Sequence, residues 1–377
     1  MIRLTTAWES HGKGLFAIIE GLPRGLKIDL DKINGELYRR QCGYGRGARQ
    51  KIERDEVEIL SGVRNLLTLG SPVTLAVWNR DYENWKDFMA PEGCDTEGRR
   101  VENVRPGHAD LAGMIKFGAA DARDILERAS ARETAVRVAA GGIFRQLLLS
   151  LGIEVTGFVR SVGTSRDENT YTFEEIQKGR SKDLCMLDSK AEERAKREID
   201  VCKEDGDTLG GAIELRVRGL KSGFGSPMTY REKMDARIAS ALMSVQAVKG
   251  VEVGGGFSLS ALKGSEAHDE ISFENGKFTR ASNRAGGIEG GASNGEELVF
   301  CVAMKPIPTL MRGLNTVNYT TKEKTKASAE RSDVCAVPAC EAVCESALLC
   351  EIAKIVSERL GGDTLTEWKK RYGELPL

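Results

Sequence analysis

The sequence predicts a fold of mixed helices and strands, of the α+β or α/β class. Short apolar or alternating runs, rich in strand-forming residues, recur from the start of the chain to about residue 300. Longer segments with apolar residues at helical spacing lie between these runs and near the end of the chain. The 377 residues suffice for one large domain or for two smaller ones, so the number of domains stays open.

The first 80 residues predict three strands and one helix. The strands are expected at residues 14–19, 57–60 and 73–78, where apolar and β-branched residues alternate or run together. Residues 31–41 have helical spacing and follow acidic residues that suit the first turn of a helix. A loop rich in glycine and arginine comes next.

The remainder predicts further helices at residues 121–151, 232–245 and 338–360, and strands at residues 213–217 and 298–302. The first of these helices is the longest expected in the first half of the chain. A segment at 167–207 differs, because it is dense in charge and poor in large apolar residues. We therefore expect that segment to be a solvated, peripheral excursion.

Composition excludes several classes of protein. With 55 basic and 56 acidic residues the net charge is −1, so the chain as a whole is not a nucleic-acid-binding polycation. Nine cysteines, an odd number, without a secretory leader indicate reduced thiols in the cytoplasm. No apolar run reaches membrane-spanning length, so we expect no membrane contact.

Two of the three histidines lie in compact polar motifs bounded by glycine. His11 belongs to the motif Glu-Ser-His-Gly at residues 9–12, and His108 to Arg-Pro-Gly-His-Ala-Asp at residues 105–110. Imidazole exchanges protons near neutral pH, so such loops suit proton transfer. A single histidine is more often structural, but two similar loops favour catalysis. His268 has carboxylates beside it and suits a capping or ion-paired role.

The loop at residues 39–49 places four arginines around glycines. Guanidinium groups bind carboxylates and phosphates through paired hydrogen bonds, so an anion site is one interpretation. RNA binding by the arginines and the tyrosine of the loop is a second. A solvated basic loop is the third.

In the expected helix 121–151, Arg128 and Arg132 are four residues apart and would share one face, with Ser130 nearby. An anion or a flavin phosphate fits that face. A surface helix in which Glu127 and Glu133 pair with these arginines is the interpretation that the segment alone favours.

Other motifs argue against metals and dinucleotides. Cys335, Cys340, Cys344 and Cys350 match no zinc-knuckle spacing and have no histidine nearby, so we interpret them as packing residues and predict no metal. The glycines at 286–291 precede a strand instead of following one, which disfavours a nicotinamide-binding Rossmann domain.

Taken together, the segments resemble the chorismate synthase family along nearly the whole chain. Its three signature stretches appear in order, at residues 9–23, 127–141 and 331–345. Further family-like pieces are residues 105–110, 243–252, 268–270, 290–295 and 304–309.

The resemblance implies a single α+β domain over residues 1–377, a β-α-β sandwich of two antiparallel sheets flanked by helices, assembled as a homotetramer. It implies that reduced FMN is bound beside the substrate, 5-enolpyruvylshikimate 3-phosphate. The reaction would be a 1,4-elimination of phosphate to give chorismate, in the shikimate pathway of aromatic amino-acid biosynthesis. No reductase domain is visible, so NADPH would act only through an external flavin reductase. A flavin reductase that uses nicotinamide directly is the rival enzyme.

The resemblance also assigns roles to individual residues. His11, with Ser10 beside it, would protonate the departing phosphate. His108 would protonate or stabilise the anionic reduced flavin, and Asp333 would accept a proton near the flavin N5. The substrate-binding residues would be Arg40, Arg46, Arg105, Arg132 and Arg331. The FMN-binding residues would be Arg128, Ala129, Ser130, Gln246, Ala247, Gly290, Lys305, Pro306, Ile307, Pro308, Thr309 and Arg331.

The sequence departs from the family pattern at three places. Trp8 stands where the family usually has glycine, and a bulky indole there is expected to crowd the turn that carries Ser10 and His11. Gln41 and Cys42 replace an Arg-Pro pair found in some members, which removes one anion contact. Cys340 replaces a smaller side chain, which we expect to affect packing alone.

Overall fold

A computed structural model describes residues 1–377 except 48–53, 181–182, 275, 328–331 and 377. One antiparallel sheet comes from the first 80 residues, with strand order β1-β2-β6-β3. Its strands are β1 (Arg3–Trp8), β2 (Gly14–Glu20), β3 (Glu58–Ser61) and β6 (Val73–Trp78). All three strands that the sequence predicted in this region are confirmed, because β2, β3 and β6 cover them.

A second antiparallel sheet contains the later strands, in the order β10-β15-β9-β7-β8. Its strands are β7 (Glu154–Val162), β8 (Ser165–Arg166), β9 (Gly211–Arg218), β10 (Val248–Val253) and β15 (Leu298–Met304). The predicted strands at 213–217 and 298–302 are the cores of β9 and β15. Both sheets are antiparallel, and their strands together with the helices confirm the mixed helix and strand class.

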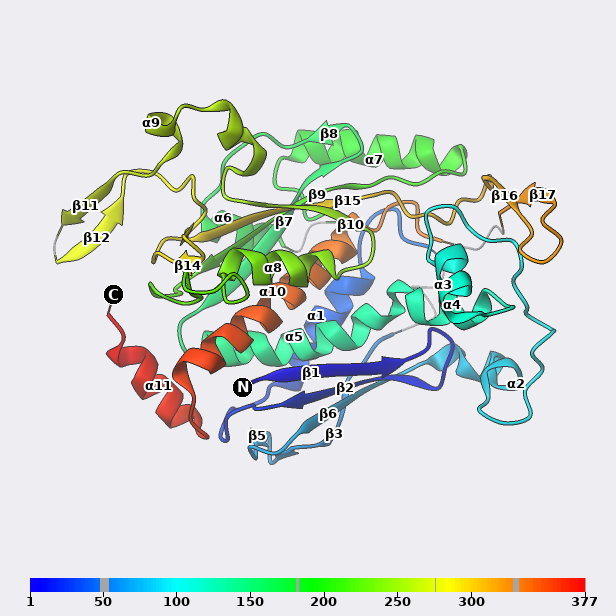
Figure 1. The fold of residues 1–377 in the computed structure, drawn as a ribbon, viewed down its shortest axis with the longest axis horizontal. Coiled ribbons are helices and arrows are strands. Elements are labelled where there is room, and N and C mark those ends of the chain that lie inside the picture. Colours follow the sequence, from blue (N-terminus) through cyan, green and yellow to red (C-terminus); the bar gives the residue numbers. More distant parts are fainter. Residues whose placement is uncertain (48–53, 181–182, 275, 328–331, 377) are drawn as a thin grey trace.

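Helices α5 (Thr134–Leu149) and α10 (Val337–Leu360) lie between the two sheets (Figure 1). Helix α5 packs on β2 and β6 of the first sheet, and α10 packs on β7 and β9 of the second. Helices α1 (Leu30–Gln41) and α8 (Met234–Met243) pack beside α10. Helices therefore flank both sheets, as expected, and the main ones form a layer between them.

Smaller elements surround this frame. The described residues also form two-stranded ribbons beside the two expected sheets: β4 (Val63–Arg64) with β5 (Leu67–Thr68), β11 (Ile271–Glu274) with β12 (Lys277–Arg280), β13 (Ile288–Glu289) with β14 (Ala292–Ser293), and β16 (Asn315–Val317) with β17 (Lys324–Lys326). The other helices are α2 (Lys86–Met89), α3 (Asp110–Phe117), α4 (Arg123–Ala129), α6 (Phe173–Gly179), α7 (Ser189–Glu204), α9 (Gly264–Ala267) and α11 (Leu365–Glu374). Short 3-10 helices occupy Arg80–Asn84, Ala131–Glu133 and Gly256–Ala261. In the described part of the chain, no helix is long and apolar enough to cross a membrane.

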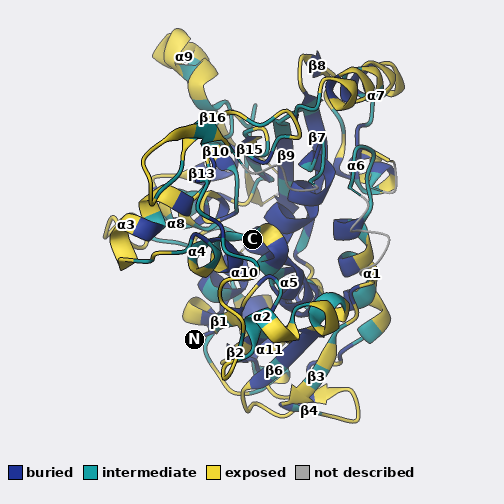
Figure 2. Cartoon of the chain, turned by 90° about the vertical axis from the view of Figure 1, so that its right-hand side faces the viewer, coloured by how far each residue is buried: buried dark blue, intermediate teal, exposed yellow. Residues whose placement is uncertain are grey.

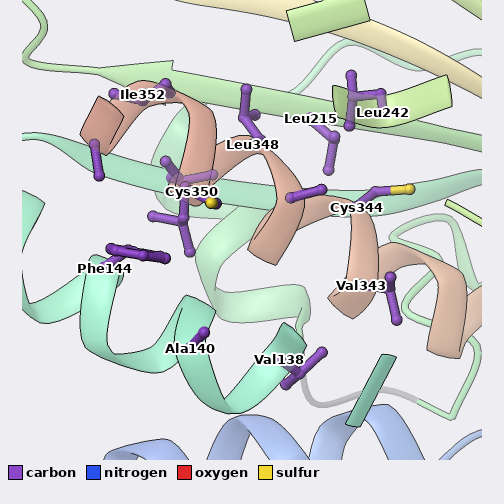
Figure 3. Close-up of a cluster of buried hydrophobic side chains, with 14 of the residues drawn as sticks. Val138, Ala140, Phe144, Leu215, Leu242, Val343, Cys344, Leu348, Cys350 and Ile352 are labelled. Carbon is purple, nitrogen blue, oxygen red and sulfur yellow. The ribbon is translucent and has the colours of Figure 1, made fainter. Parts of the chain in front are cut away.

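The core forms where the two central helices meet. Val138, Ala140 and Phe144 of α5 point toward α10, and Leu215 of β9 and Leu242 of α8 pack from the other side (Figure 3). Figure 2 shows the central helices buried while the exposed residues gather at the periphery. This helix pair fills the space between the sheets, because α10 buries side chains around nearly its whole circumference.

The cysteines near the end of the chain are part of this core. Cys335, Cys340, Cys344 and Cys350 are all buried and form no disulfide. Their interpretation as packing residues is confirmed.

The predicted helix at 121–151 is interrupted. Helix α4 ends at Ala129, and Ser130 takes an extended conformation with φ −64° and ψ 144°. The Ser130 hydroxyl accepts a hydrogen bond from the Arg132 N–H, which caps the short 3-10 helix that precedes α5. Arg128 and Arg132 therefore do not share a helix face, and that part of the sequence prediction is wrong.

The charged segment at 167–207 lies at the edge of the molecule, but it is not solvated on all sides. Ala191, Ala195 and Ile199 form a buried stripe on α7. Leu184 and Met186 are also fully buried in the main core. This narrow stripe of small and aliphatic residues is enough to pack α7 against the rest of the protein. The sequence did not indicate the stripe, because the segment contains few large apolar residues.

A buried ionic cluster joins the helix layer. Within the described residues, three arginines and three glutamates form it, with Arg39 bound to Glu341 at 2.6 Å and Arg145 bound to Glu345 at 2.5 Å. Its members are Glu36 and Arg39 of α1, Arg145 of α5, Arg180, and Glu341 and Glu345 of α10. The cluster ties α1, α5 and α10 to the segment after α6.

Glu341 and Glu345 are expected to affect stability in opposite ways. Burial and the nearby Glu345 raise the pKa of Glu341 to about 8, although Arg39 opposes the shift. Between the usual glutamate pKa of 4.5 and about pH 8, Glu341 therefore keeps its proton in the folded protein and loses it in the unfolded chain. The free energy of unfolding therefore falls as pH rises through that range. Burial opposes ionisation of Glu345 too, but the surrounding arginines hold its pKa well below its usual value.

We predict that Glu341→Gln makes the free energy of unfolding less sensitive to pH between pH 4.5, the usual pKa of a glutamate, and about pH 8, the raised pKa of Glu341, because the amide cannot ionise. The matched variant Glu345→Gln is predicted to lose about 3 kcal/mol at neutral pH by leaving three arginines without their shared partner. Urea unfolding across this pH range measures both. Parallel pH curves for the wild type and Glu341→Gln would contradict the assignment.

Candidate active site

A cavity of about 610 Å³ opens where the first sheet, the starts of α5 and α10, and the segments beside β10 and β15 come together. Most residues that the sequence selected line it, although they come from positions 10 to 333. They are Ser10, His11, Arg40, Arg46, Arg105, His108, Ala129, Ser130, Arg132, Gln246, Ala247, Lys305, Ile307, Pro308, Thr309 and Asp333. The fold therefore brings the separate motifs to one place.

Three of the selected residues that the structure describes, Arg128, Gly290 and Pro306, are not among those that line the cavity. The Arg128 guanidinium lies over the Trp8 ring instead, 4.8 Å from its centroid. Gly290 lies in the turn between β13 and β14, and Pro306 is in the chain between two lining residues. Arg331 lies outside the described residues. The predicted contacts of these four with ligands stay predictions.

His11 is held by a carboxylate and by an aromatic ring. Its Nδ1 lies 2.9 Å from Oε1 of Glu127, and its main-chain N–H donates to Oε2 of Glu127 at 2.8 Å. The imidazole stacks on Trp85 with 3.7 Å between ring centroids. Because Nδ1 is engaged, Nε2 is the ring nitrogen that remains for a reaction.

Glu127 is suited to this partnership. Burial acts to raise its pKa, but the hydrogen bonds from His11 outweigh burial and lower it, so the carboxylate is ionised at neutral pH. Glu127 also accepts a hydrogen bond from Arg123 at 3.2 Å. Its main-chain carbonyl accepts the N–H of Ser10 at 3.0 Å, which fixes the loop between β1 and β2.

His108 forms a second histidine–carboxylate pair. Its Nδ1 lies 2.5 Å from Oδ1 of Asp110, and the Arg105 guanidinium donates to the same carboxylate at 2.8 Å. Burial opposes the ionisation of Asp110, but these two partners hold its pKa well below its usual range. Nε2 of His108 is likewise the ring nitrogen that remains for chemistry.

The described lining carries six cationic side chains and one carboxylate, Asp333. The cations are Arg40, Arg46, Arg105, Arg132, Lys249 and Lys305. Such a surface attracts ligands that carry several negative charges.

Two carboxylates, Asp55 behind the lining and Asp333 in it, hold these cations in place. Asp55 binds Arg132 at 2.7 Å and Arg40 at 3.2 Å, so one carboxylate serves two guanidinium groups. Asp333 binds Arg46 at 2.6 Å and accepts the Gly47 N–H at 2.6 Å. Burial lowers the pKa of Arg40 to about 9, which still leaves it protonated at neutral pH.

These contacts decide between the interpretations of the loop at 39–49. Arg39 belongs to the buried ionic cluster, while Arg40 and Arg46 are engaged at the cavity. The Tyr44 hydroxyl donates to Asp200 at 2.8 Å. Within the described residues the loop is neither a solvated basic loop nor a surface for RNA, and Arg49 lies outside them.

The interpretation of the segment around Ser130 as a surface helix, with Glu127 and Glu133 paired to Arg128 and Arg132, is also wrong. Arg132 points inward to Asp55, and its Nε donates to Asn79 at 2.9 Å. Glu127 binds His11, while Glu133 accepts hydrogen bonds from Thr6 and Gln246. Both glutamates therefore bind side chains that line the cavity, His11 and Gln246.

The expected crowding of the histidine loop by Trp8 stays a prediction, while the place of the indole itself is clear. The Trp8 side chain is 4% exposed and packs in the main core, on the inner face of the first sheet. The indole takes part in the core, and the turn that carries Ser10 and His11 begins after it.

The sequence did not reveal several residues that shape the cavity. Asp55, Asn79 and Trp85 were not selected, and Glu127 was considered only as a partner of arginines. Asp110 had a usable signal, because it follows His108 by two residues in the same motif. The other four are far in sequence from the residues they hold.

Comparison with known proteins identifies the family. The model of the family described as chorismate synthase matches residues 2–356. The chain belongs to the chorismate synthase family. A chorismate synthase from Geobacter sulfurreducens is 52% identical over 383 residues, which cover 99% of this chain and 98% of the relative. One from Alkaliphilus metalliredigens is 50% identical over 374 residues, with 99% and 98% covered.

A solved structure titled "Crystal Structure of Chorismate Synthase" superposes with a TM-score of 0.79 at 39% identity and covers 99% of this chain and 96% of that one. The chain is therefore an enzyme, a lyase that eliminates phosphate and serves aromatic biosynthesis. The rival interpretations as an RNA-binding module or a flavin reductase gain no support from these relatives.

We predict that Glu127→Gln slows phosphate release about 100-fold, because the neutral amide no longer stabilises a proton on His11. The matched control is Asp124→Asn, an exposed residue on the same helix, which is expected to keep wild-type turnover. Steady-state phosphate release measures both variants. Equal rates for the two variants would remove Glu127 from this role.

Proposed function

We propose that the chain converts 5-enolpyruvylshikimate 3-phosphate into chorismate with the help of reduced FMN. The observation that carries this proposal is the joining of two histidine–carboxylate pairs with six cationic side chains in one cavity. The substrate carries a phosphate and two carboxylates, and guanidinium groups bind both kinds of anion through paired hydrogen bonds. Of the predicted substrate-binding residues, Arg40, Arg46, Arg105 and Arg132 suit this role, and Arg331 is retained as a prediction.

The part of the cavity wall around Gln246 suits a flavin. Oε1 of Gln246 is buried there and has no hydrogen-bond partner among the described residues, so it suits an N–H donor on a ligand. We assign FMN contacts to Ala129, Ser130, Gln246 and Ala247. The remaining assignments are Arg128, Gly290, Lys305, Pro306, Ile307, Pro308, Thr309 and Arg331. Reduced FMN, when bound, supplies electron density that favours departure of the allylic phosphate.

His11 would carry the proton for the leaving group. Its Nε2 can donate to a phosphate oxygen while Glu127 stabilises the charged imidazole through Nδ1. Ser10 lies beside it, with its hydroxyl donating to Ser130 at 3.2 Å. This arrangement makes phosphate a better leaving group as the bond breaks.

His108 and Asp333 would handle the remaining protons. His108 would hold a proton at Nε2 near the cofactor, with Asp110 fixing its orientation. Asp333 would accept a proton near the flavin N5. Its carboxylate is already oriented by Arg46 and by the Gly47 N–H, so it needs no rearrangement.

We also infer the broader properties that the family resemblance implies. These are a single domain over residues 1–377, a homotetramer, a cytoplasmic location and supply of reduced flavin by an external NADPH-dependent reductase. A continuous core that includes residues from Ile2 to Tyr372 supports the single domain.

The proposal predicts equimolar phosphate and chorismate from 5-enolpyruvylshikimate 3-phosphate under anaerobic conditions with chemically reduced FMN. Oxidised FMN alone is expected to give neither product, because it lacks the electrons that assist elimination. Phosphate and chorismate are followed together in the same reaction. Turnover with oxidised FMN, or NADPH oxidation by the pure protein, would overturn the assigned cofactor roles.

His11→Ala is predicted to lower turnover by about 10² to 10⁴-fold while FMN still binds, because a general acid is lost and the wall around Gln246 is kept. His268→Ala is the control, since His268 is not among the residues that line the cavity. Turnover and FMN affinity are measured on both variants. Wild-type turnover in His11→Ala would exclude the acid role.

A further inference from the structure

The turn between α8 and β10 separates two cavities. Ser244 lines the active-site cavity and also a second cavity of about 820 Å³ between β1, α5, α8 and α10. Gln246 and Ala247 face the active site, while Glu133 and Arg137 line the second cavity. Buried Val245 and Val248 anchor the main chain of this turn. Ser244 and Gln246 of this turn line cavities, so hydrogen bonds are expected to orient their side chains where close packing does not.

Glu133 accepts such a hydrogen bond from Gln246. Oε2 of Glu133 accepts from Nε2 of Gln246 at 3.0 Å, and Oε1 accepts from the Thr6 hydroxyl at 2.9 Å. A carboxylate offers only acceptors, so the amide must turn its NH₂ group toward Glu133. The orientation of the Gln246 amide is therefore fixed by the chemistry of its partner.

This orientation leaves the amide oxygen as the atom that a ligand can use. Oε1 of Gln246 is buried without a hydrogen-bond partner in the described structure. A buried acceptor without a partner costs free energy, so the arrangement suits a donor that arrives with a ligand. The backbone is also unusual here, because Ala247 has φ +69°, a conformation that side chains other than glycine rarely adopt.

We infer that Glu133 is a positioning residue that makes Gln246 a hydrogen-bond acceptor for an N–H group of the bound cofactor. The inference rests on the proposed binding of FMN, whose isoalloxazine ring carries such an N–H group. Glu133 acts through Gln246 and does not itself line the active-site cavity. It thereby selects ligands that present a donor at this point of the wall.

A double-mutant cycle tests the inference through FMN affinity, measured by flavin fluorescence without turnover. Glu133→Ala and Gln246→Leu are each expected to weaken FMN binding about 10-fold, the loss of roughly one hydrogen bond. The double variant should bind no more weakly than either single variant, because both remove the same interaction. Additive losses, or wild-type affinity in Glu133→Ala, would overturn the inference.

Two further variants separate orientation from general structure. Glu133→Gln keeps an oxygen that can accept from Gln246 and should bind FMN more tightly than Glu133→Ala. Glu351→Gln changes another glutamate of the second cavity, one that binds Arg237 and Lys354, and should keep wild-type affinity. If Glu351→Gln weakens FMN as much as Glu133→Ala, the effect is structural and the inference fails. If the wild type binds no FMN, the proposed function itself fails.

Discussion

The site depends on one electrostatic constraint, the sharing of Asp55 by Arg40 and Arg132. Two buried guanidinium groups close together repel each other and lose hydration, and a carboxylate between them offsets both costs. The three side chains come from α1, from the segment before β3 and from the segment before α5. Their pairing therefore fixes the relation between these elements as well as the charge that the cavity presents.

The same arrangement recurs around the cavity. Asp110 supports His108 and Arg105, Glu127 supports His11, and in each case the acid lies behind the group that faces the ligand. Groups held in this way need little reorganisation when a charged ligand arrives. The starts of α5 and α10 border the same cavity, and the positive ends of their helix dipoles add to its attraction for anions.

The sequence predicts the elements well where the periodicity is strong and where no side chain competes with the backbone. Residues 73–78 and the helix at 31–41 are examples, because local apolar patterns decide them. The helix at 121–151 was wrong because the Ser130 hydroxyl caps a new turn, and a periodicity argument does not contain that competition.

The two histidine motifs were found because each is compact in sequence. The partners that give them their chemistry were mostly missed, since His11 and Glu127 are separated by 116 positions. The fold brings them together by placing the loop between β1 and β2 against the end of α4. The sequence likewise did not predict that the Arg132 side chain points inward, because its partner Asp55 lies 77 positions away.

The most direct test of this account is the kinetic comparison of Asp55→Asn with the wild type at neutral pH. If Asp55 positions Arg40 and Arg132 for the substrate, the kcat/KM of the Asp55→Asn variant should be at least about 10-fold lower than that of the wild type, because the two guanidinium groups lose their common carboxylate. The variant is expected to stay folded. A folded Asp55→Asn variant with wild-type kcat/KM would contradict the central role given to this carboxylate.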